Sequence, residues 1–64
     1  MMYHWVIQVH KGSYAAVGPF KSEDACHRRY DKTKGGEIHE FRSQSAIAEE
    51  VIDEFKSDMA GGRI

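Results

Sequence analysis

The only proline of this 64-residue chain, Pro19, limits the possible folds more than any other residue. It directly follows Gly18 and comes at the end of an apolar run that otherwise favours a β-strand. Because proline has no backbone N–H, a sheet accepts it only where no neighbouring strand needs that donor. We therefore expect the strand that contains Pro19 to lie at an edge of its sheet.

Residues 3–9 predict the strand that pairs with it. Large apolar side chains occupy the odd positions and mostly polar ones the even positions, which is the period of a half-buried strand. Gly12-Ser13 suits a two-residue type II′ turn between the two strands. This turn would place Trp5 opposite Phe20 and leave Pro19 in a pair without ladder hydrogen bonds. A third strand must then pair with the first, so the predicted strand order is 2-1-3.

The residues after this hairpin predict a helix. Ser22 can cap its N-terminus, and Glu23 and Asp24 in the first turn suit the positive end of the helix dipole. Gly35 is expected to end the helix. We expect its buried stripe to consist of Ala25, Cys26, Tyr30 and the aliphatic stem of Arg29.

A third strand and a second helix complete the chain. Residues 36–42 favour a short strand, but Ile38 and Phe41 would point to opposite faces, so its register stays open and a bulge is one option. A second helix is predicted from Ser43 or Ser45 to about Ala60, followed by a glycine pair that ends it. Its apolar stripe would contain Ile47, Ala48, Val51, Ile52, Phe55 and Met59.

Together these elements predict an α+β fold of order ββαβα. Its three-stranded antiparallel sheet would have the strand order 2-1-3, with both helices packed on the one strongly apolar face. A chain of this size forms one domain at most. We therefore assign 1–64 to a single domain, with 61–64 as a flexible tail. The predicted core contains Trp5, Ile7, Phe20, Tyr30, Val51 and Phe55.

Composition excludes several classes of protein. The formal net charge is −1 with 30% charged residues, which is typical of an ordinary folded domain and not of a strongly basic nucleic-acid binder. The single cysteine, Cys26, cannot form an internal disulfide, which favours a reducing compartment. No apolar run is long enough for a membrane helix, and residues 1–14 do not resemble a signal peptide. We expect a cytoplasmic protein without a membrane partner.

The histidines and the cysteine do not form a recognisable reactive site. His4 and His10 lie six positions apart on one strand, about 20 Å at ~3.3 Å per residue, which is too far for one metal ion. Cys26 and His27 are neighbours on a helix and point about 100° apart. We therefore predict no catalytic residues, no metal site and no cofactor, so the chain should not be an enzyme.

Two surfaces are candidates for protein binding. With both helices on one face, the other face of the hairpin would expose an apolar patch, and such patches often mark interfaces. The second surface is the acidic side of the second helix. The candidate interface residues are His4, Val6, Gln8, His10, Ala15 and Val17 on the sheet, and Glu49, Glu50, Asp53 and Glu54 on the helix.

These surfaces suggest a small non-enzymatic, accessory or inhibitor-like module that binds an unidentified protein. The open edge of the second strand, residues 14–17, also predicts a possible homodimer. The alternative hypothesis is a nucleic-acid-binding module in which Arg28, Arg29 and Lys32 of the first helix contact phosphates.

Three resemblances bear on these hypotheses. "VIQVHKGSY" and "VGPFKSEDA" resemble phrases of SPOR repeats, which implies peptidoglycan binding. The order ββαβα, with "VGPFKSEDACHRRY" followed by "GGEIHEFRS", is similar to the hybrid-binding domain of some ribonucleases H, which implies binding to RNA–DNA hybrids. That family has a tryptophan and basic residues where this chain has Glu23 and Asp24. The compact size and the "WVIQV" to "VGPF" hairpin also look like small accessory proteins of bacterial viruses, most of them of unknown function.

Overall fold

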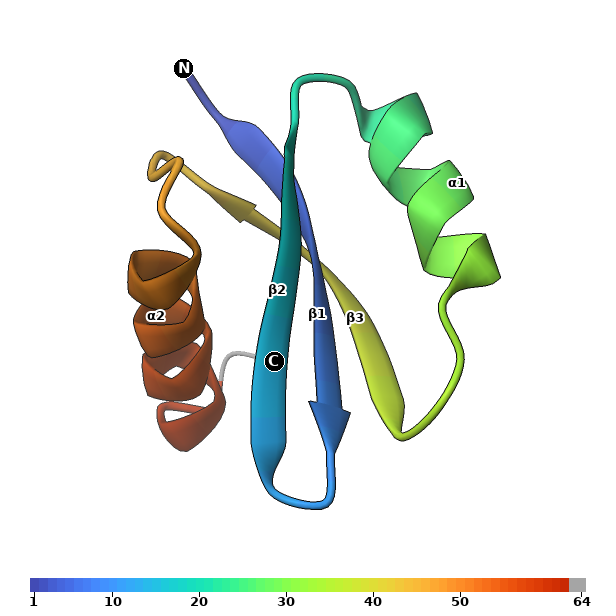
Figure 1. Cartoon of the computed structure of the whole chain (residues 1–64). Helices are drawn as coiled ribbons and strands as arrows, with labels where there is room; N and C mark the ends of the chain where they lie inside the picture. Colours follow the sequence, from blue (N-terminus) through green and yellow to red (C-terminus); the bar gives the residue numbers. More distant parts are fainter. Residues whose placement is uncertain (63–64) are drawn as a thin grey trace.

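A computed structural model describes residues 1–62, and its elements follow the predicted order ββαβα (Figure 1). The three strands form one antiparallel sheet with the order β2-β1-β3, so the α+β class and the strand order are confirmed. The part of the predicted tail at 63–64 lies outside the described residues. The elements are β1 (Tyr3–His10), β2 (Ser13–Phe20), α1 (Glu23–Lys32), β3 (Glu37–Ser43) and α2 (Ala48–Ala60).

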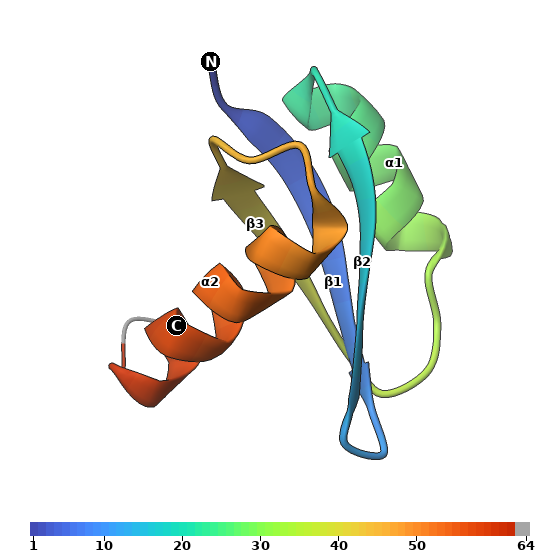
Figure 2. The same cartoon turned by 60° about the vertical axis from the view of Figure 1, so that its left-hand side comes forward.

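The prediction that both helices pack on one face of the sheet is wrong. Val51 and Phe55 of α2 form the core cluster with Trp5 and Ile7, two β1 residues whose side chains share one face of the sheet. Helix α1 lies on the opposite face. Its residue His27 bonds to Glu40, which pairs with Val6 and therefore points to the same face as Val6. Figures 1 and 2 both show the sheet between the two helices.

The reason lies in three consecutive apolar residues of the central strand. Trp5, Val6 and Ile7 are all buried, with at most 1% of each residue exposed. Successive side chains of a strand point to opposite faces, so this run makes both faces of the sheet apolar at its centre. A sheet with two apolar faces needs a covering layer on each side.

The same arrangement explains the poor alternation of β3. Ile38 pairs with Gln8 and therefore faces α1, whereas Phe41 pairs with Trp5 and faces α2. The ladder between β1 and β3 is regular, without the bulge that was one option. Each of the two apolar side chains is half-buried on its own face of the sheet.

The hairpin turn differs from the predicted one by a single residue. Lys11 and Gly12 occupy it with φ angles of 52° and 78°, which is a type I′ turn, and His10 pairs with Ser13. The predicted type II′ turn at Gly12-Ser13 is therefore wrong, although both turn types match the twist of the two strands.

The register of the hairpin also changes near its open end. Val6 pairs with Val17, but His4 pairs with Phe20, so β2 has one extra residue in a bulge that contains Gly18 and Pro19. The peptide bond between these two residues is cis. The predicted pair of Trp5 and Phe20 is therefore wrong. The edge position of β2 is right, because a bulge on an edge strand also leaves no ladder partner for proline.

Gly18 makes room for the indole ring of Trp5. Its φ is 153°, and a Cβ atom at this position would lie 2.9 Å from Cε3 of Trp5 and 3.1 Å from the carbonyl oxygen of His4. The indole Nε1 donates a hydrogen bond to the carbonyl of Ser45 at 3.2 Å, before α2 begins. Trp5 thus connects the bulge of β2 with the start of α2.

The core is split between the two faces. Phe55 contacts Tyr14, His39 and Phe41, with ring centroids 5.1–6.4 Å apart, on the α2 side. The predicted core residues Phe20 and Tyr30 are only half-buried, because Phe20 pairs with His4 and Tyr30 belongs to α1. Trp5, Ile7, Val51 and Phe55 are confirmed as core residues.

The ends of the helices agree in part with the prediction. The Ser22 hydroxyl accepts the N–H of Ala25 at 3.1 Å and caps α1 as expected, but the helix ends at Lys32 with Thr33 as its C-cap, before Gly35. Arg29 is exposed instead of lying along the buried stripe. Helix α2 begins only at Ala48, since the Ser45 hydroxyl accepts the N–H of Ile47 in the preceding loop.

We expect Phe55→Ala to lower the free energy of unfolding by about 3–5 kcal/mol, because it leaves a cavity among Tyr14, His39 and Phe41. A domain of this size has about that much stability, so the variant should be largely unfolded. Asp53→Asn on the exposed side of α2 is the control and should change stability by no more than about 0.5 kcal/mol. Urea denaturation followed by far-UV circular dichroism measures both, and a stably folded Phe55→Ala would refute this assignment of the core.

Gly18→Ala should destabilise the chain by about 1–3 kcal/mol, because its methyl group would overlap the Trp5 ring and the backbone has positive φ. The emission of Trp5 should change at the same time, since the indole must move. Gly12→Asn, at a turn position with no atom within 4 Å of an added Cβ, is the matched control and should leave the emission unchanged. An unchanged midpoint in urea for Gly18→Ala would contradict the packing described here.

Candidate functional site

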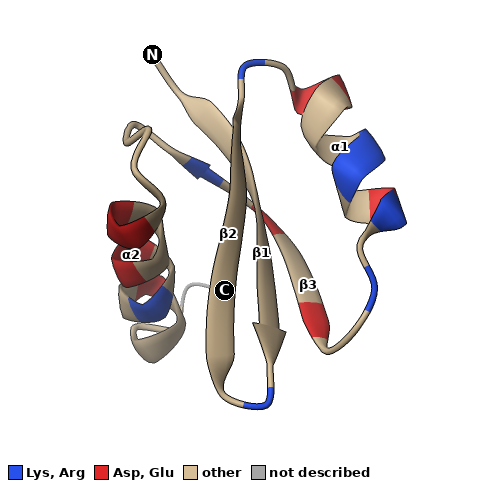
Figure 3. Cartoon of the chain, in the orientation of Figure 1, with Lys and Arg blue, Asp and Glu red and all other residues tan. Residues whose placement is uncertain are grey.

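The outer side of α2 is strongly acidic. Figure 3 shows acidic residues along this helix, whereas most basic residues belong to α1 and to the turns. The sheet lies between the two helices, so their charges face opposite sides of the molecule. The four predicted residues of α2, Glu49, Glu50, Asp53 and Glu54, are all exposed.

Two of these four carboxylates hold the loop before the helix. Glu54 accepts a hydrogen bond from the hydroxyl of Ser43 at 2.5 Å, and Glu50 accepts one from Ser45 at 2.8 Å. Ser43 is itself 1% exposed and also accepts the N–H of Ser45. Glu50 and Glu54 therefore position the connection from β3 to α2, in addition to carrying charge.

The other two carboxylates, Glu49 and Asp53, have no hydrogen-bond or ion-pair partner within residues 1–62. The one basic residue of α2, Lys56, places its Nζ 4.7 Å from the centroid of the Tyr14 ring, a cation–π contact with β2. Glu49 and Asp53 are thus charged groups that are free to meet a basic partner.

The sheet face predicted as an apolar interface is covered by α1 and by the segment that follows it. Val6, the centre of the predicted patch, is completely buried. The side-chain amide of Gln8 donates hydrogen bonds to the carbonyls of Lys34 and Gly35, at 3.0 and 2.9 Å. Among the remaining candidates, His4 and Val17 are half-buried, and His10 and Ala15 are exposed. The premise of an open apolar sheet face is therefore wrong.

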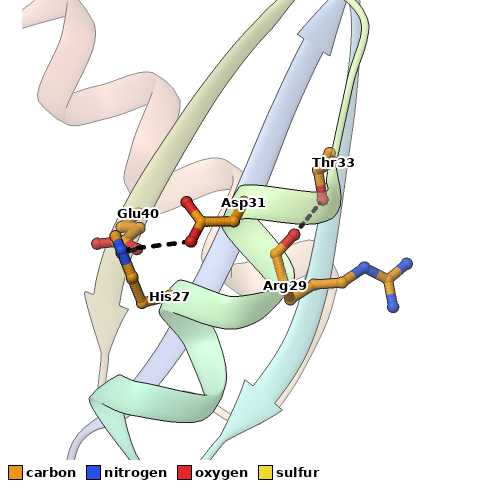
Figure 4. Close-up of polar contacts among 5 residues, drawn as sticks. All are labelled: His27, Arg29, Asp31, Thr33 and Glu40. Carbon is orange, nitrogen blue, oxygen red and sulfur yellow. Dashed lines mark hydrogen bonds and ion pairs between the residues drawn. The ribbon is translucent and has the colours of Figure 1, made fainter.

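The basic residues of α1 are partly neutralised by their neighbours. Arg28 forms an ion pair with Asp24 one turn earlier in the helix. Arg29 points away from the helix in Figure 4, while its backbone carbonyl accepts a hydrogen bond from Thr33 at 2.7 Å. Arg29 and Lys32 are exposed and have no side-chain partner among the described residues. Two cations of α1 thus remain available for phosphates.

His27 links α1 to β3, a contact that the sequence pattern did not predict. Its Nδ1 lies 2.9 Å from Oε1 of Glu40, and its Nε2 lies 3.6 Å from a carboxylate oxygen of Asp31 (Figure 4). The hydrogen bond with Glu40, and then the negative charge of Asp31, raise the pKa of His27 above its ordinary value of 6.5. Both ring nitrogens can donate only when the imidazole is protonated.

Cys26 is poorly suited to nucleophilic chemistry. The residue is 2% exposed, and burial, followed by the charges of Glu40 and Glu23, raises the pKa of its thiol. No described side chain forms a hydrogen bond with the sulfur, and His39 lies on the opposite face of the sheet against Phe55. An activated cysteine needs a lowered pKa and an adjacent base, and this thiol has neither.

The described residues lack the features of two further classes of protein. Within residues 1–62, no three His, Cys, Asp or Glu side chains converge on a point where they could bind one metal ion. Within the same residues, neither α1 nor α2 has the length and hydropathy of a membrane-spanning helix. Comparison with known proteins found no matching family model, no similar curated protein and no similar solved structure.

We expect Glu40→Gln to lower the pKa of His27 toward its ordinary value, because it removes the hydrogen-bonded carboxylate that stabilises the protonated imidazole. The stabilising contact of His27 should be fully present below pH 6.5 and be lost as the pH rises through the raised pKa of the folded state. NMR titration of the His27 ring protons measures both effects. Glu37→Gln, on the same strand, is the control, and equal His27 titration curves in the two variants would contradict this assignment.

Proposed function

We propose that this chain is a small non-enzymatic module that binds a partner protein through the acidic outer side of α2. The observation that carries the proposal is the pair of exposed, unpartnered carboxylates of Glu49 and Asp53. They lie four positions apart, so they are neighbours on the same side of the helix. A partner with a basic patch would meet two charges that no group among residues 1–62 already neutralises.

The coverage of both sheet faces supports the choice of α2 over the sheet. Helix α1 and residues 33–36 occupy the face that was the other candidate, and Val6 is buried there. The carboxylates of α2 are preorganised by a rigid element, since Val51 and Phe55 anchor the helix in the core. Rigid presentation reduces the entropic cost of binding.

We also propose a cytoplasmic location, because the one cysteine is free and buried and forms no disulfide. An accessory or inhibitor-like role, as in the small proteins of bacterial viruses that the hairpin resembles, is compatible with a module of this size. Nucleic-acid binding through Arg28, Arg29 and Lys32 is the second candidate, because Arg29 and Lys32 have no partner among the described residues. Asp24, Asp31 and Glu40 nearby weaken that candidate.

An NMR titration of the ¹⁵N-labelled chain distinguishes the two candidates. The probes are lysine- and arginine-rich peptides, and single- and double-stranded oligonucleotides. We expect the peptides to shift the amides around Glu49 and Asp53, and the double variant Glu49→Gln/Asp53→Asn to weaken binding about tenfold at low salt. The matched control is Glu37→Gln on β3, which should leave the affinity unchanged.

Oligonucleotide binding that shifts the amides of α1 and is weakened by Arg29→Gln/Lys32→Gln would favour the second candidate instead. Its affinity would fall steeply with salt, because phosphate contacts release counterions. If no basic peptide binds at low salt, the proposal that α2 is the binding surface is refuted.

A further inference from the structure

The outer edge of β2 presents backbone groups that neither of the other two described strands satisfies. Since His10 and Ser13 close a two-residue turn as a hydrogen-bonded pair, the pairs alternate along the ladder. The N–H and C=O groups of Tyr14 and Ala16 therefore point away from β1. None of the hydrogen bonds among residues 1–62 outside the sheet ladder uses them.

The two edges of the sheet differ in charge. β3 carries Glu37, Glu40 and Arg42 among its seven residues, and such charges discourage pairing with a further strand. β2 contains no charged residue from Ser13 to Phe20. Its bulge at Gly18 and Pro19 interrupts only one end, so residues 13–17 keep a regular strand geometry. β2 is the edge that can accept another strand.

Helix α2 borders this edge with both apolar and acidic side chains. Lys56 contacts Tyr14, which identifies the side of the helix next to β2. Ile52, half-buried, and Met59, 37% exposed, lie four positions before and three after Lys56, so they share that side. Glu49 and Asp53 lie next to Lys56 on the helix surface, on the side away from Ile52 and Met59. A strand added to β2 would therefore lie beside Ile52 and Met59, with Lys56 held over the Tyr14 ring and the carboxylates of Glu49 and Asp53 beyond it.

We propose that residues 13–17 of β2 bind an extended segment of the partner protein as an added β-strand, with apolar and basic side chains directed toward α2. This inference rests on the proposed function and specifies the form of the partner. Ladder hydrogen bonds to Tyr14 and Ala16 would supply affinity, and contacts with α2 would supply selectivity. The basic side chains would pair with Glu49 and Asp53.

A second copy of this chain fits the edge less well than such a segment. Its own β2 offers no basic side chain to the carboxylates. Antiparallel pairing of two β2 strands about a twofold axis also places equivalent faces on the same side of the joined sheet. The two acidic α2 helices would then lie on one side and repel each other, which disfavours the predicted homodimer.

The test uses the ¹⁵N-labelled full chain and a blocked hexapeptide, Lys-Thr-Val-Thr-Lys-Thr, whose lysines and valine share one side of an extended strand. Two isomers of the peptide, one N-methylated at its three odd positions and one at its three even positions, have the same charge and composition but lack the N–H donors of one edge. We expect the parent peptide to shift the amides of Tyr14 and Ala16 and to slow their hydrogen exchange. At least one isomer should bind about tenfold more weakly, because it has lost ladder hydrogen bonds.

Variants of the chain provide an independent reading. Ala16→Pro removes an N–H that points away from β1, so it should abolish peptide binding while the ladder to β1 is retained. Glu49→Gln/Asp53→Asn should weaken the binding of the lysine-containing peptide, and should not weaken the binding of the same peptide with glutamate in place of each lysine. If Ala16→Pro fails to fold, the N-methylated peptides on the unchanged chain still decide the question.

Three results would overturn the inference. If both N-methylated isomers bind like the parent and only α2 amides shift, the edge is not used, although the proposed acidic surface survives. If no basic peptide binds, the edge and the acidic surface both fail. If sedimentation shows a dimer whose Tyr14 and Ala16 amides are protected without any peptide, the partner of the edge is a second copy.

Discussion

The structure depends on the burial of three successive residues, Trp5, Val6 and Ile7, in the central strand. Their side chains alternate between the two faces of the sheet, so no single layer of helices could cover all three. Helix α2 covers Trp5 and Ile7 through Val51 and Phe55, and α1 covers the face of Val6. This run of three apolar residues is the physical reason why the two helices lie on opposite faces of the sheet.

Covering both faces of so small a sheet leaves few surfaces for binding. What remains are the outer sides of the helices and the two sheet edges. On one side of the molecule the carboxylates of Glu49 and Asp53 have no partner within residues 1–62 and adjoin an uncharged edge strand. On the other side, α1 pairs Arg28 with Asp24 and His27 with Asp31. The combination of a neutral β edge and an acidic helix is why we look for an extended, basic segment in the partner.

The contacts that hold the two helices differ in kind. Phe55 packs against three aromatic rings, and the loss of such a buried ring typically costs several kcal/mol. The contact of His27 with Glu40 is exposed, and ion pairs of that kind contribute little stability. Helix α2 therefore makes the larger aromatic contact with the sheet, whereas α1 contributes the buried Cys26, which is 2% exposed. The His27 contact instead makes the α1 side responsive to pH, because protonation determines whether both imidazole nitrogens donate.

The sequence by itself determined the elements, their order and the edge position of β2. These features depend on local chemistry: alternation in residues 3–9, the cap at Ser22, helical spacing around Val51 and Phe55, and the missing N–H of Pro19. Two features of the sequence also indicate a double-sided core: the apolar run Trp5–Ile7, and Ile38 and Phe41, which point to opposite faces of the sheet. Only the tertiary structure decided the turn at Lys11 and Gly12, the bulge opposite Trp5, the face that each helix covers and the contact of His27 with Glu40. Those features depend on which side chains from distant parts of the sequence pack against one another. Packing of the whole chain determines these contacts, and no local sequence pattern specifies them.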